Sequence, residues 1–415
     1  MRQFDSARGR QRPCSVRRAP ARLRPSESGP ALVGRYRDAV RLFDTARAEI
    51  VPLEPGEVVS LYVCGITPYD STHIGHARTF LTYDVLQRRL RDIGFETRCV
   101  RNVTDVDDSI LSRARSLGVH YLDLAAAALI TFETDMNALG LLPAYSEPRA
   151  TSAISDIRLL IGRVLDSGHA YISRGAVYFD VSTASDFGQL SLLDRETMLE
   201  RAAEHGGRPD DPNKRDPLDF VLWQPSLAGE PEWSSQWGPG RPGWHVECSA
   251  LALRELGPDF DLHGGGSDLV FPHHECEWVQ AEAATGTRFV RHWMHSGEVR
   301  LDGRKMSKSQ GNLCFISDLR RDWDPMAVRL AIVAEHYRTT LDWSHDLVAQ
   351  STDRLDRWSR VSAGFTPEGV AGLDEVRLAL DDDLNTPAAI EAIDRVVEEE
   401  SGSVVRAAAL IGVTW

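Results

Sequence analysis

Val58-Val59-Ser60-Leu61-Tyr62-Val63-Cys64-Gly65-Ile66-Thr67-Pro68 is the stretch of this 415-residue chain that decides its fold. The first six residues form a compact apolar run typical of a buried strand, and the following Gly and Pro predict a turn. Helical periodicity covers about residues 77–90, and a second strand is predicted over Thr97–Val100. Strand, turn, helix and strand open an α/β fold with a parallel, doubly wound sheet, where ligands bind at the carboxyl ends of strands.

Further sequence patterns predict the remaining helices and strands of this Rossmann-like fold. Helices are expected at 125–129 and 154–165, a hairpin at 176–181, strands at 260–262 and 293–295, and helices from about 325, with Asp381-Asp382-Asp383 as a solvated acidic cap. Residues 204–217 and 229–243 are rich in loop-forming residues. We therefore expect a disordered Arg-rich arm (1–34), the first half of the catalytic domain (35–110), a mostly helical connective insertion (111–203), the second half (204–300), a polar loop with its following region (301–345) and a C-terminal helical domain (346–415).

Composition limits the classes of protein and the compartment. The net charge is −14, which argues against a protein coated with nucleic acid, and no apolar run is long enough to span a membrane. Six scattered cysteines without a secreted-scaffold spacing indicate single thiols in a reducing, cytoplasmic setting. The first 30 residues hold eight arginines and no apolar core of a signal peptide. A transit peptide is one alternative, but a disordered arm or an over-long start is favoured.

Two short motifs, His73-Ile74-Gly75-His76 and Lys305-Met306-Ser307-Lys308-Ser309, carry the clearest chemistry. His73 and His76 lie where the turn enters the helix, whose free N–H groups and partial positive charge favour phosphate. Lys305 and Lys308 lie in a polar, Gly-flanked loop and would neutralise charge on a departing pyrophosphate. Surface histidines and a solvated basic loop are the alternatives for each motif alone. Together and in this order, the motifs predict nucleotide chemistry.

Other residues give weaker signals on their own. Cys64 ends the first strand, and Cys248 and His273 lie far along the chain, so spacing alone favours two buried free cysteines and a core histidine over a metal site. His263-Gly264-Gly265-Gly266-Ser267-Asp268 would let the backbone approach a ligand closely, although a flexible loop has the same composition.

Taken together, these segments resemble the cysteine-activating enzymes of the class I aminoacyl-tRNA synthetase family over about residues 36–345. The matching segments are Tyr62-Val63-Cys64-Gly65, 73–76, Asn102-Val103-Thr104-Asp105-Val106-Asp107-Asp108, Pro242-Gly243-Trp244-His245-Val246-Glu247-Cys248-Ser249, 263–268, 271–275 and 305–309. The resemblance implies that Cys64, Cys248 and His273 hold one Zn²⁺, which binds the substrate thiolate and separates cysteine from serine.

The resemblance also implies the remaining roles. His73, His76, Lys305 and Lys308 would stabilise the α-phosphate and pyrophosphate of ATP, which enters with Mg²⁺. The cysteinyl-adenylate pocket would comprise Cys64, Gly65, Ile66, Thr67, Thr79, Asn102, Val103, Thr104, Trp244, Gly266, Ser267, Asp268 and Val299. Residues 301–345 would include the second signature loop and a stem-contact-like region. No residue is singled out as a general base.

Two branches of this family differ in the acceptor of the cysteinyl group. Features that resemble the mycothiol ligases, which use the amine of a glucosaminyl-inositol, are Gly65–Asp70, the 204–209 segment and a short tail after Ser344. In that segment, Glu-His-Gly-Gly-Arg-Pro departs twice from the ligase pattern Glu-Arg-Gly-Gly-Asp-Pro. Features that resemble cysteinyl-tRNA synthetases are Ala77-Arg78-Thr79, Glu147–Thr151 and Glu277, whose match there is a fourth metal ligand.

We therefore expect a monomeric ATP-dependent ligase that joins L-cysteine to the amino sugar, without tRNA and without a membrane. Three alternatives remain: a cysteinyl-tRNA synthetase lacking an anticodon-binding domain, a paralogue that cysteinylates another small amine, and a silent nucleotide- or zinc-binding paralogue. Intact signature motifs count against the last.

Overall fold

The structure is a computed structural model that describes residues 40–69, 71–301, 303–306 and 311–415. The expected Arg-rich arm (1–34), Asp70 and Lys308 lie outside the described residues. For Lys305, only the backbone is described.

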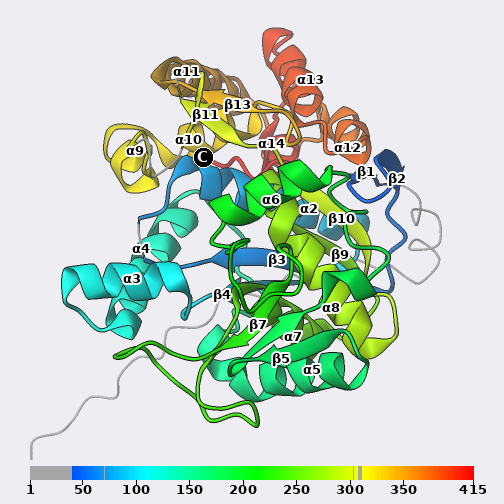
Figure 1. The fold of residues 1–415 in the computed structure, drawn as a ribbon. Helices are drawn as coiled ribbons and strands as arrows, with labels where there is room; N and C mark the ends of the chain where they lie inside the picture. The colour runs from blue at the N-terminus through cyan, green and yellow to red at the C-terminus, as the bar shows by residue number, and fades with distance from the viewer. Residues whose placement is uncertain (1–39, 70, 302, 307–310) are drawn as a thin grey trace, which may run out of the picture.

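A parallel four-stranded sheet forms the centre of the molecule (Figure 1). Its order is β10-β9-β3-β4, with β3 (Val58–Ile66), β4 (Glu96–Val103), β9 (Phe260–Gly266) and β10 (Val290–Ser296). The predicted strands and the doubly wound α/β class are confirmed. Because β3 lies between β4 and β9, the sheet brings carboxyl ends about 200 residues apart in the chain next to each other.

Helices cover both faces of this sheet because its strands are buried on both sides. The helix predicted at 77–90 is confirmed as α2 (Ile74–Ile93), which begins within the first signature and ends at the left-handed Gly94. It shares one apolar core with the C-terminal helices, and α5 (Ile154–Asp166), α7 (Trp244–Leu256) and α8 (Glu275–Thr285) belong to the core on the other face. The C-terminal helices lie at the top of Figure 1, and α5 and α7 lie at the bottom.

A second, antiparallel sheet has the order β5-β6-β7-β8. The predicted hairpin is confirmed, but it begins earlier, with β5 (Ala170–Ser173) before β6 (Ala176–Phe179). This hairpin pairs with β7 (Phe220–Gln224) and β8 (Arg241–Pro242), so one sheet joins the ranges 111–203 and 204–300. The other elements up to residue 274 are β1 (Arg41–Asp44), β2 (Glu49–Pro52), α3 (Asp108–Leu117), α4 (Tyr121–Ala138), η1 (Ala150–Ala153), η2 (Val181–Thr183), α6 (Arg195–Glu204), η3 (Ser267–Leu269) and η4 (Val270–His274).

The last 120 residues end in helices, as expected, but they begin with a small sheet that the sequence does not predict. The sheet has the order β12-β11-β13, and its strands are β11 (Val299–Leu301), β12 (Arg304–Lys305) and β13 (Leu341–Trp343). The helices are α9 (Ile316–Asp322), α10 (Pro325–Val333), α11 (His345–Ser362), α12 (Leu373–Asp381), α13 (Thr386–Glu398) and α14 (Val405–Leu410). Among the described residues, no helix combines the length and apolar character needed to cross a membrane.

The prediction that residues 381–383 form a solvated acidic cap holds for Asp382, which is exposed, but is wrong for Asp383. Asp383 is buried and accepts hydrogen bonds from the Phe43 amide (2.9 Å) and the Tyr337 hydroxyl (2.7 Å). Asp381 pairs with Arg89. Runs of acidic residues are usually exposed, but here specific donors from distant segments compensate for the loss of water.

Candidate active site

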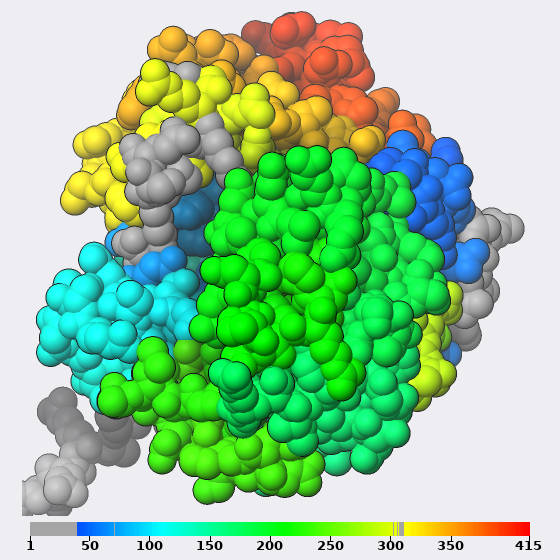
Figure 2. Space-filling model, in the orientation of Figure 1, coloured from blue at the N-terminus to red at the C-terminus, as the bar shows by residue number. Residues whose placement is uncertain are grey.

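A cavity of about 570 Å³ opens at the carboxyl ends of β3 and β9 and at the N-terminus of α2. In Figure 2 a hollow lies between the green segment that includes α6 and β7, the yellow segment near residues 300–320 and the cyan α3–α4 pair, with part of the blue N-terminal half at its base. This is the position at which doubly wound folds bind ligands. The sheet order therefore assembles the cavity from parts of the chain that are far apart in sequence.

The first signature forms part of the cavity wall. His73 is the N-cap residue of α2, and the His73 and His76 rings stack with their centroids 3.8 Å apart. Both imidazoles line the cavity beside the helix N-terminus, where backbone N–H groups and the helix dipole favour an anion. The pair therefore lies at a position that favours an anion.

The second signature also contributes to the cavity wall, through Met306, the one residue of this motif that the structure describes in full. Met306 is buried and lines the cavity, and its amide donates to the Val299 carbonyl (3.2 Å). The segment that follows is hydrogen-bonded to the first signature, since the Ile74 amide donates to the Cys314 carbonyl (3.0 Å). The two signatures, about 230 residues apart in the sequence, are thus joined by backbone contacts.

Most residues predicted for the adenylate pocket line the cavity, and a few lie next to it. The lining set is Cys64, Gly65, Thr67, Thr79, Trp244, Gly266, Ser267, Asp268 and Val299. Ile66, Asn102, Val103 and Thr104 are instead buried at the ends of β3 and β4.

Gly65 shows why the ends of these strands fit together. Its amide donates to Asn102 Oδ1 (2.8 Å), and a Cβ at this position would lie 1.7 Å from the Asn102 carbonyl oxygen. Asn102 Nδ2 in turn donates to Thr104 Oγ1 (3.1 Å). Only glycine permits this approach, so the buried Asn102 fixes the backbone on which Cys64 and Thr67 are placed.

The sequence suggests that the three glycines at 264–266 let the backbone approach a ligand, but the structure gives another reason for most of them. Of the three, only Gly266 lines the cavity. A Cβ on Gly264 would lie 2.3 Å from the Tyr83 hydroxyl, which accepts from the Gly265 amide (2.6 Å) and donates to the Met294 carbonyl (2.7 Å). Gly264 therefore serves packing against α2. A Cβ on Gly265 would lie 2.8 Å from Leu269 and 3.0 Å from His274, so this glycine serves packing against the η3 and η4 turns.

Beneath the cavity lies a buried cluster of side chains that are suited to a metal ion. Cys64, Cys248, His273 and Glu277 bring one ligand atom each within 4.8 Å of one another, and each of the four side chains is at most 5% exposed. Glu277 Oε1 lies 2.9 Å from His273 Nε2 and 3.3 Å from the Cys64 sulfur. The cluster joins the end of β3, the first turns of α7 and α8 and the η4 turn.

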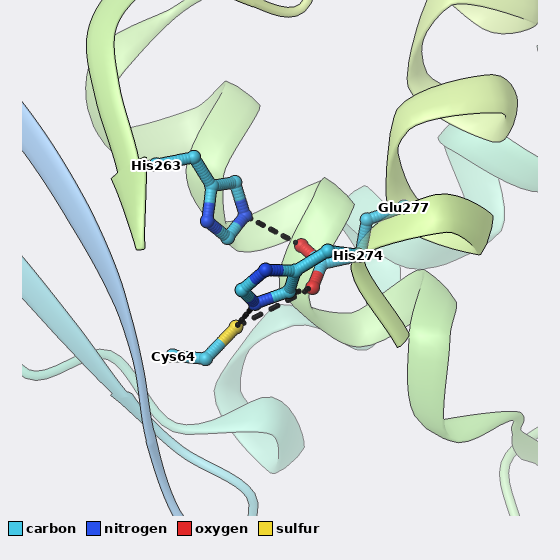
Figure 3. Close-up of side chains that lie close together, drawn as sticks. All are labelled: Cys64, His263, His274 and Glu277. Atoms are coloured by element: carbon cyan, nitrogen blue, oxygen red, sulfur yellow. Dashed lines mark hydrogen bonds and ion pairs between the residues drawn. The ribbon is translucent and has the colours of Figure 1, made fainter. Parts of the chain in front are cut away.

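A second set shares Cys64 and Glu277 with the first and adds His263 and His274 (Figure 3). His263 Nε2 lies 3.0 Å from Glu277 Oε2, and His274 Nε2 lies 3.3 Å from the Cys64 sulfur. The other ring nitrogen of His274 is 2.7 Å from His295. These contacts add to those that His273 makes with the same cluster and help to orient Cys64 and Glu277. Of the two sets, only the first supplies two thiolates, which a soft metal prefers.

The electrostatics of the first set fit a cation. Burial raises the pKa of Cys64, whose thiol donates a hydrogen bond to Cys248 and thereby lowers the Cys248 pKa to about 7. Burial opposes charge on His273, but Glu277 and Cys248 outweigh it and raise the His273 pKa to about 10. Burial likewise opposes ionisation of Glu277, yet His273 and His263 lower its pKa to about 2. Metal sites of this kind bind the ion as their thiol and imidazole groups release protons. The four residues of the first set therefore fit a metal ion.

Trp244 connects the cavity with this cluster. Its ring lines the cavity and stacks on the His273 ring with centroids 4.1 Å apart. On the neighbouring position, His245 Nδ1 lies 2.9 Å from His273 Nδ1. A ligand in the cavity is therefore separated from His273 by one aromatic ring.

Comparison with known proteins identifies the family. The family model for the class I (C) tRNA synthetase catalytic domain matches residues 49–353. A Thermobispora bispora protein named L-cysteine:1D-myo-inositol 2-amino-2-deoxy-alpha-D-glucopyranoside ligase is 47% identical over 86% of this chain and 89% of its own length. The chain belongs to this ligase family of class I synthetases. A Nakamurella multipartita protein of the same name is 44% identical over 94% of this chain and 98% of its own length.

Solved structures support the class I fold. Mycobacterium tuberculosis methionyl-tRNA synthetase in complex with methionyl-adenylate superimposes with a TM-score of 0.62, at 15% identity, over 86% of this chain and 87% of its own. Agrobacterium radiobacter K84 LeuRS gives a TM-score of 0.63, at 11% identity, over 89% and 85% of the two chains. At such identities the similarity concerns the fold alone.

The structure adds polar residues to the site that sequence patterns do not single out. His263 and His274 contact the metal-type cluster, and Ser296 lies 3.0 Å from Thr79 at the cavity wall. Asp107 also lines the cavity. For Ser296 and Asp107 the available signal is positional, because Ser296 ends β10 and Asp107 follows β4, at the edge where members of this fold class bind ligands. His263 lies within β9 and His274 in η4, and no comparable signal marks them.

Proposed function

We propose that this chain is an ATP-dependent ligase that adenylates L-cysteine and transfers it to the 2-amine of 1D-myo-inosityl 2-amino-2-deoxy-α-D-glucopyranoside. The products are the amide, AMP and diphosphate. The observation that carries the proposal is the cavity whose wall holds residues of both signatures and whose floor covers a buried Cys-Cys-His-Glu cluster. The names and the 44–48% identity of the relatives support the choice of acceptor.

In the first half-reaction, the cysteine carboxylate attacks the α-phosphate of ATP. His73 and His76 would donate hydrogen bonds to the α-phosphate beside the α2 N-terminus, and Lys305 and Lys308 would neutralise the pyrophosphate, with Mg²⁺ accompanying ATP. Hydrogen-bond donors and cations that are already positioned where negative charge develops in the transition state usually make the largest single contribution to such catalysis.

Selection of cysteine would depend on zinc. Cys64, Cys248 and His273 would hold the ion, and Glu277 lies close enough to complete the set. A bound zinc supplies affinity for the substrate thiolate, which serine lacks. Trp244 and the strand end after Cys64 would then position the rest of the amino acid at the cavity wall.

In the second half-reaction, the acceptor would enter from the side of the cavity opposite the signatures. That side is lined by residues of the α6 end and the following loop: Glu204, His205, Gly206, Gly207, Arg208 and Lys214. The segment 204–209 is the one that resembles the ligase branch, and its location in the same cavity supports a role in binding the amino sugar. We propose that the enzyme is monomeric and does not need tRNA.

Two assays test the proposal in sequence. Cysteine-dependent exchange of pyrophosphate into ATP by the zinc-loaded protein tests adenylation, and serine serves as the control amino acid. The activated enzyme is then offered glucosaminyl-inositol and tRNA in parallel. Labelled cysteine on the amino sugar supports the ligase, whereas label on tRNA alone would favour a synthetase, as the resemblance of Glu277 suggests. Absence of exchange would overturn both.

A further inference from the structure

The reaction proposed above leaves one chemical requirement without a residue. An aliphatic amine is mostly protonated in neutral water, and an ammonium nitrogen has no free electron pair for attack on the adenylate. A group in the cavity that binds the ammonium and takes one proton would remove this barrier, and general bases of this kind contribute roughly 10²- to 10⁴-fold in rate.

We infer that Asp107 is the general base for the acceptor amine in the transfer half-reaction. The inference rests on the proposed function, because it requires an amine acceptor. Asp107 lines the cavity, and its Oδ2 lies 3.5 Å from Thr67 Oγ1, on the strand end that begins at Cys64. The carboxylate is therefore next to the part of the wall proposed to hold the cysteinyl-adenylate.

The two oxygens of Asp107 have different surroundings. Oδ1 caps α3 by accepting from the Ile110 amide at 2.8 Å. Oδ2 has Thr67 at the long distance of 3.5 Å, at the limit of a hydrogen bond. One oxygen thus fixes the carboxylate in place, and the other remains available to an incoming cation.

Burial raises the pKa of Asp107, and the nearby cation, Arg241, opposes this rise but is paired with other carboxylates. Asp108 follows it on α3, and the nearby Arg241 of β8 pairs with Asp108 and with Glu230 (3.0 Å) instead. Among the residues that the structure describes, no Lys, Arg or His forms an ion pair with Asp107. Glu247 is a further carboxyl group close by. Asp107 is therefore a cavity-wall carboxylate whose charge is free to pair with an ammonium group.

The other carboxylates of the cavity wall are satisfied or exposed. Asp219 accepts from the Tyr171 hydroxyl (2.7 Å) and from backbone amides, and Glu298 pairs with Arg300 (2.8 Å). Asp268 is exposed, and its expected role is in adenylate binding. Asp107 is therefore the carboxylate best placed for an ammonium group.

Its protonation range suits this task. Burial raises the pKa of Asp107 to about 6, despite the Ile110 amide, which lowers it. A base with a pKa near the working pH is ionised at neutrality and still accepts a proton readily.

Atoms and electrons balance in the proposed step. The acceptor ammonium transfers one proton to Asp107, and the freed nitrogen attacks the carbonyl carbon of the adenylate. The new C–N bond forms as the C–O bond to the phosphate breaks, and AMP leaves with that electron pair. The nitrogen loses its second proton to water, and Asp107 returns its proton to solvent when product leaves.

The test compares the two half-reactions in Asp107→Asn. Asparagine is as good an N-cap as aspartate, so the helix start is kept while the base is removed. Pyrophosphate exchange measures adenylation, and single-turnover transfer from the enzyme-bound adenylate to glucosaminyl-inositol measures the second step. We expect transfer to fall at least about 100-fold more than adenylation at neutral pH. Asp324→Asn makes the same change at an N-cap aspartate that does not line the cavity, since Asp324 caps α10 by accepting from the Met326 amide (2.7 Å). It is the matched control and should leave the ratio of the two rates near that of the wild type.

The pH profile separates a base from a cap. Wild-type transfer should rise with pH through about 6 as Asp107 ionises. The Asn variant should lack this rise and recover toward the wild type at high pH, where the amine is already neutral. Asp107→Ser, which also retains a capping oxygen, should behave like the Asn variant.

Several outcomes would overturn the inference. Equal transfer by the wild type and both variants would show that the carboxylate is not needed. An equal fall in both half-reactions would assign Asp107 to positioning of the pocket. A wild type that forms the adenylate but charges no amine would refute the proposed function itself, a result that is distinguishable because it does not involve the variants.

Discussion

Substitution of Gly65 by alanine tests how the site is built. A Cβ there would lie 1.7 Å from the Asn102 carbonyl oxygen and 2.7 Å from its carbon, whereas ordinary contacts begin at 3.4 Å. The ends of β3 and β4 would have to separate by about 1.7 Å to restore an ordinary contact. Overpacking of this kind costs about 1–3 kcal/mol of the free energy of unfolding.

The larger effect is expected on catalysis. Cys64 lies immediately before Gly65, and Thr67 lies two residues after it, so the metal cluster and the adenylate wall would both move. A displacement of about 1 Å costs roughly 100-fold in rate. Cysteine-dependent pyrophosphate exchange should therefore fall about 100-fold or more, and the urea midpoint should decrease.

Gly162→Ala is the matched control. Gly162 lies within α5, and the nearest atom that an added Cβ would meet outside its own helix is Gln236 Nε2, at 3.9 Å. The added methyl group should stabilise the helix by up to about 1 kcal/mol and leave exchange unchanged. Wild-type exchange and an unchanged urea midpoint in Gly65→Ala would refute the reasoning that backbone contact between Gly65 and Asn102 positions the site.

Three further predictions concern the metal, the loop and a buried ion pair. Cys248→Ser should lose most bound zinc by elemental analysis, whereas Cys314→Ser should retain it; full occupancy in Cys248→Ser would contradict the ligand set. Lys308→Ala should slow pyrophosphate exchange about 10²- to 10³-fold by analogy with oxyanion donors, and an unchanged rate would exclude the loop from catalysis. Asp84→Asn should lower the free energy of unfolding by about 3–5 kcal/mol, because the fully buried Arg329 would lose its carboxylate partner. Burial opposes ionisation of Asp84, but Arg329 and Arg88 hold its pKa below the usual value, so this stabilisation is present above about pH 4 and disappears as pH falls further. Urea unfolding of Asp84→Asn that shows the wild-type midpoint at pH 7 would contradict this assignment.

Local patterns are sufficient for the elements that surround the site. The apolar run at 58–63 and the periodicity at 77–90 predict β3 and α2, because burial on both faces and one apolar helix face leave direct traces in the sequence. The prediction of a solvated acidic run fails at Asp383 and Asp381, because their partners Phe43, Tyr337 and Arg89 come from distant parts of the chain.

The metal-type cluster also depends on contacts between distant residues, which sequence patterns do not reveal. Cys64, Cys248 and His273 have no informative spacing, and the residues alone favour a core of free thiols. Their ligand atoms meet because β3 pairs with β9 and because α7 and α8 pack against the same face. Similarity to a known family supplies this set without the geometry, but only the geometry brings in His263 and His274.

By itself, the sequence determined the doubly wound fold, the two phosphate-directed motifs and the reaction class they imply, because these depend on short-range periodicity and on residues close together in the chain. Tertiary structure alone decided which side chains share the cavity and which charges remain unpaired within it. Asp107 is indistinguishable from its acidic neighbours in the sequence, yet Arg241 pairs with Asp108 and leaves Asp107 facing the cavity. Charge pairing depends on distances through space, which the order of residues does not contain.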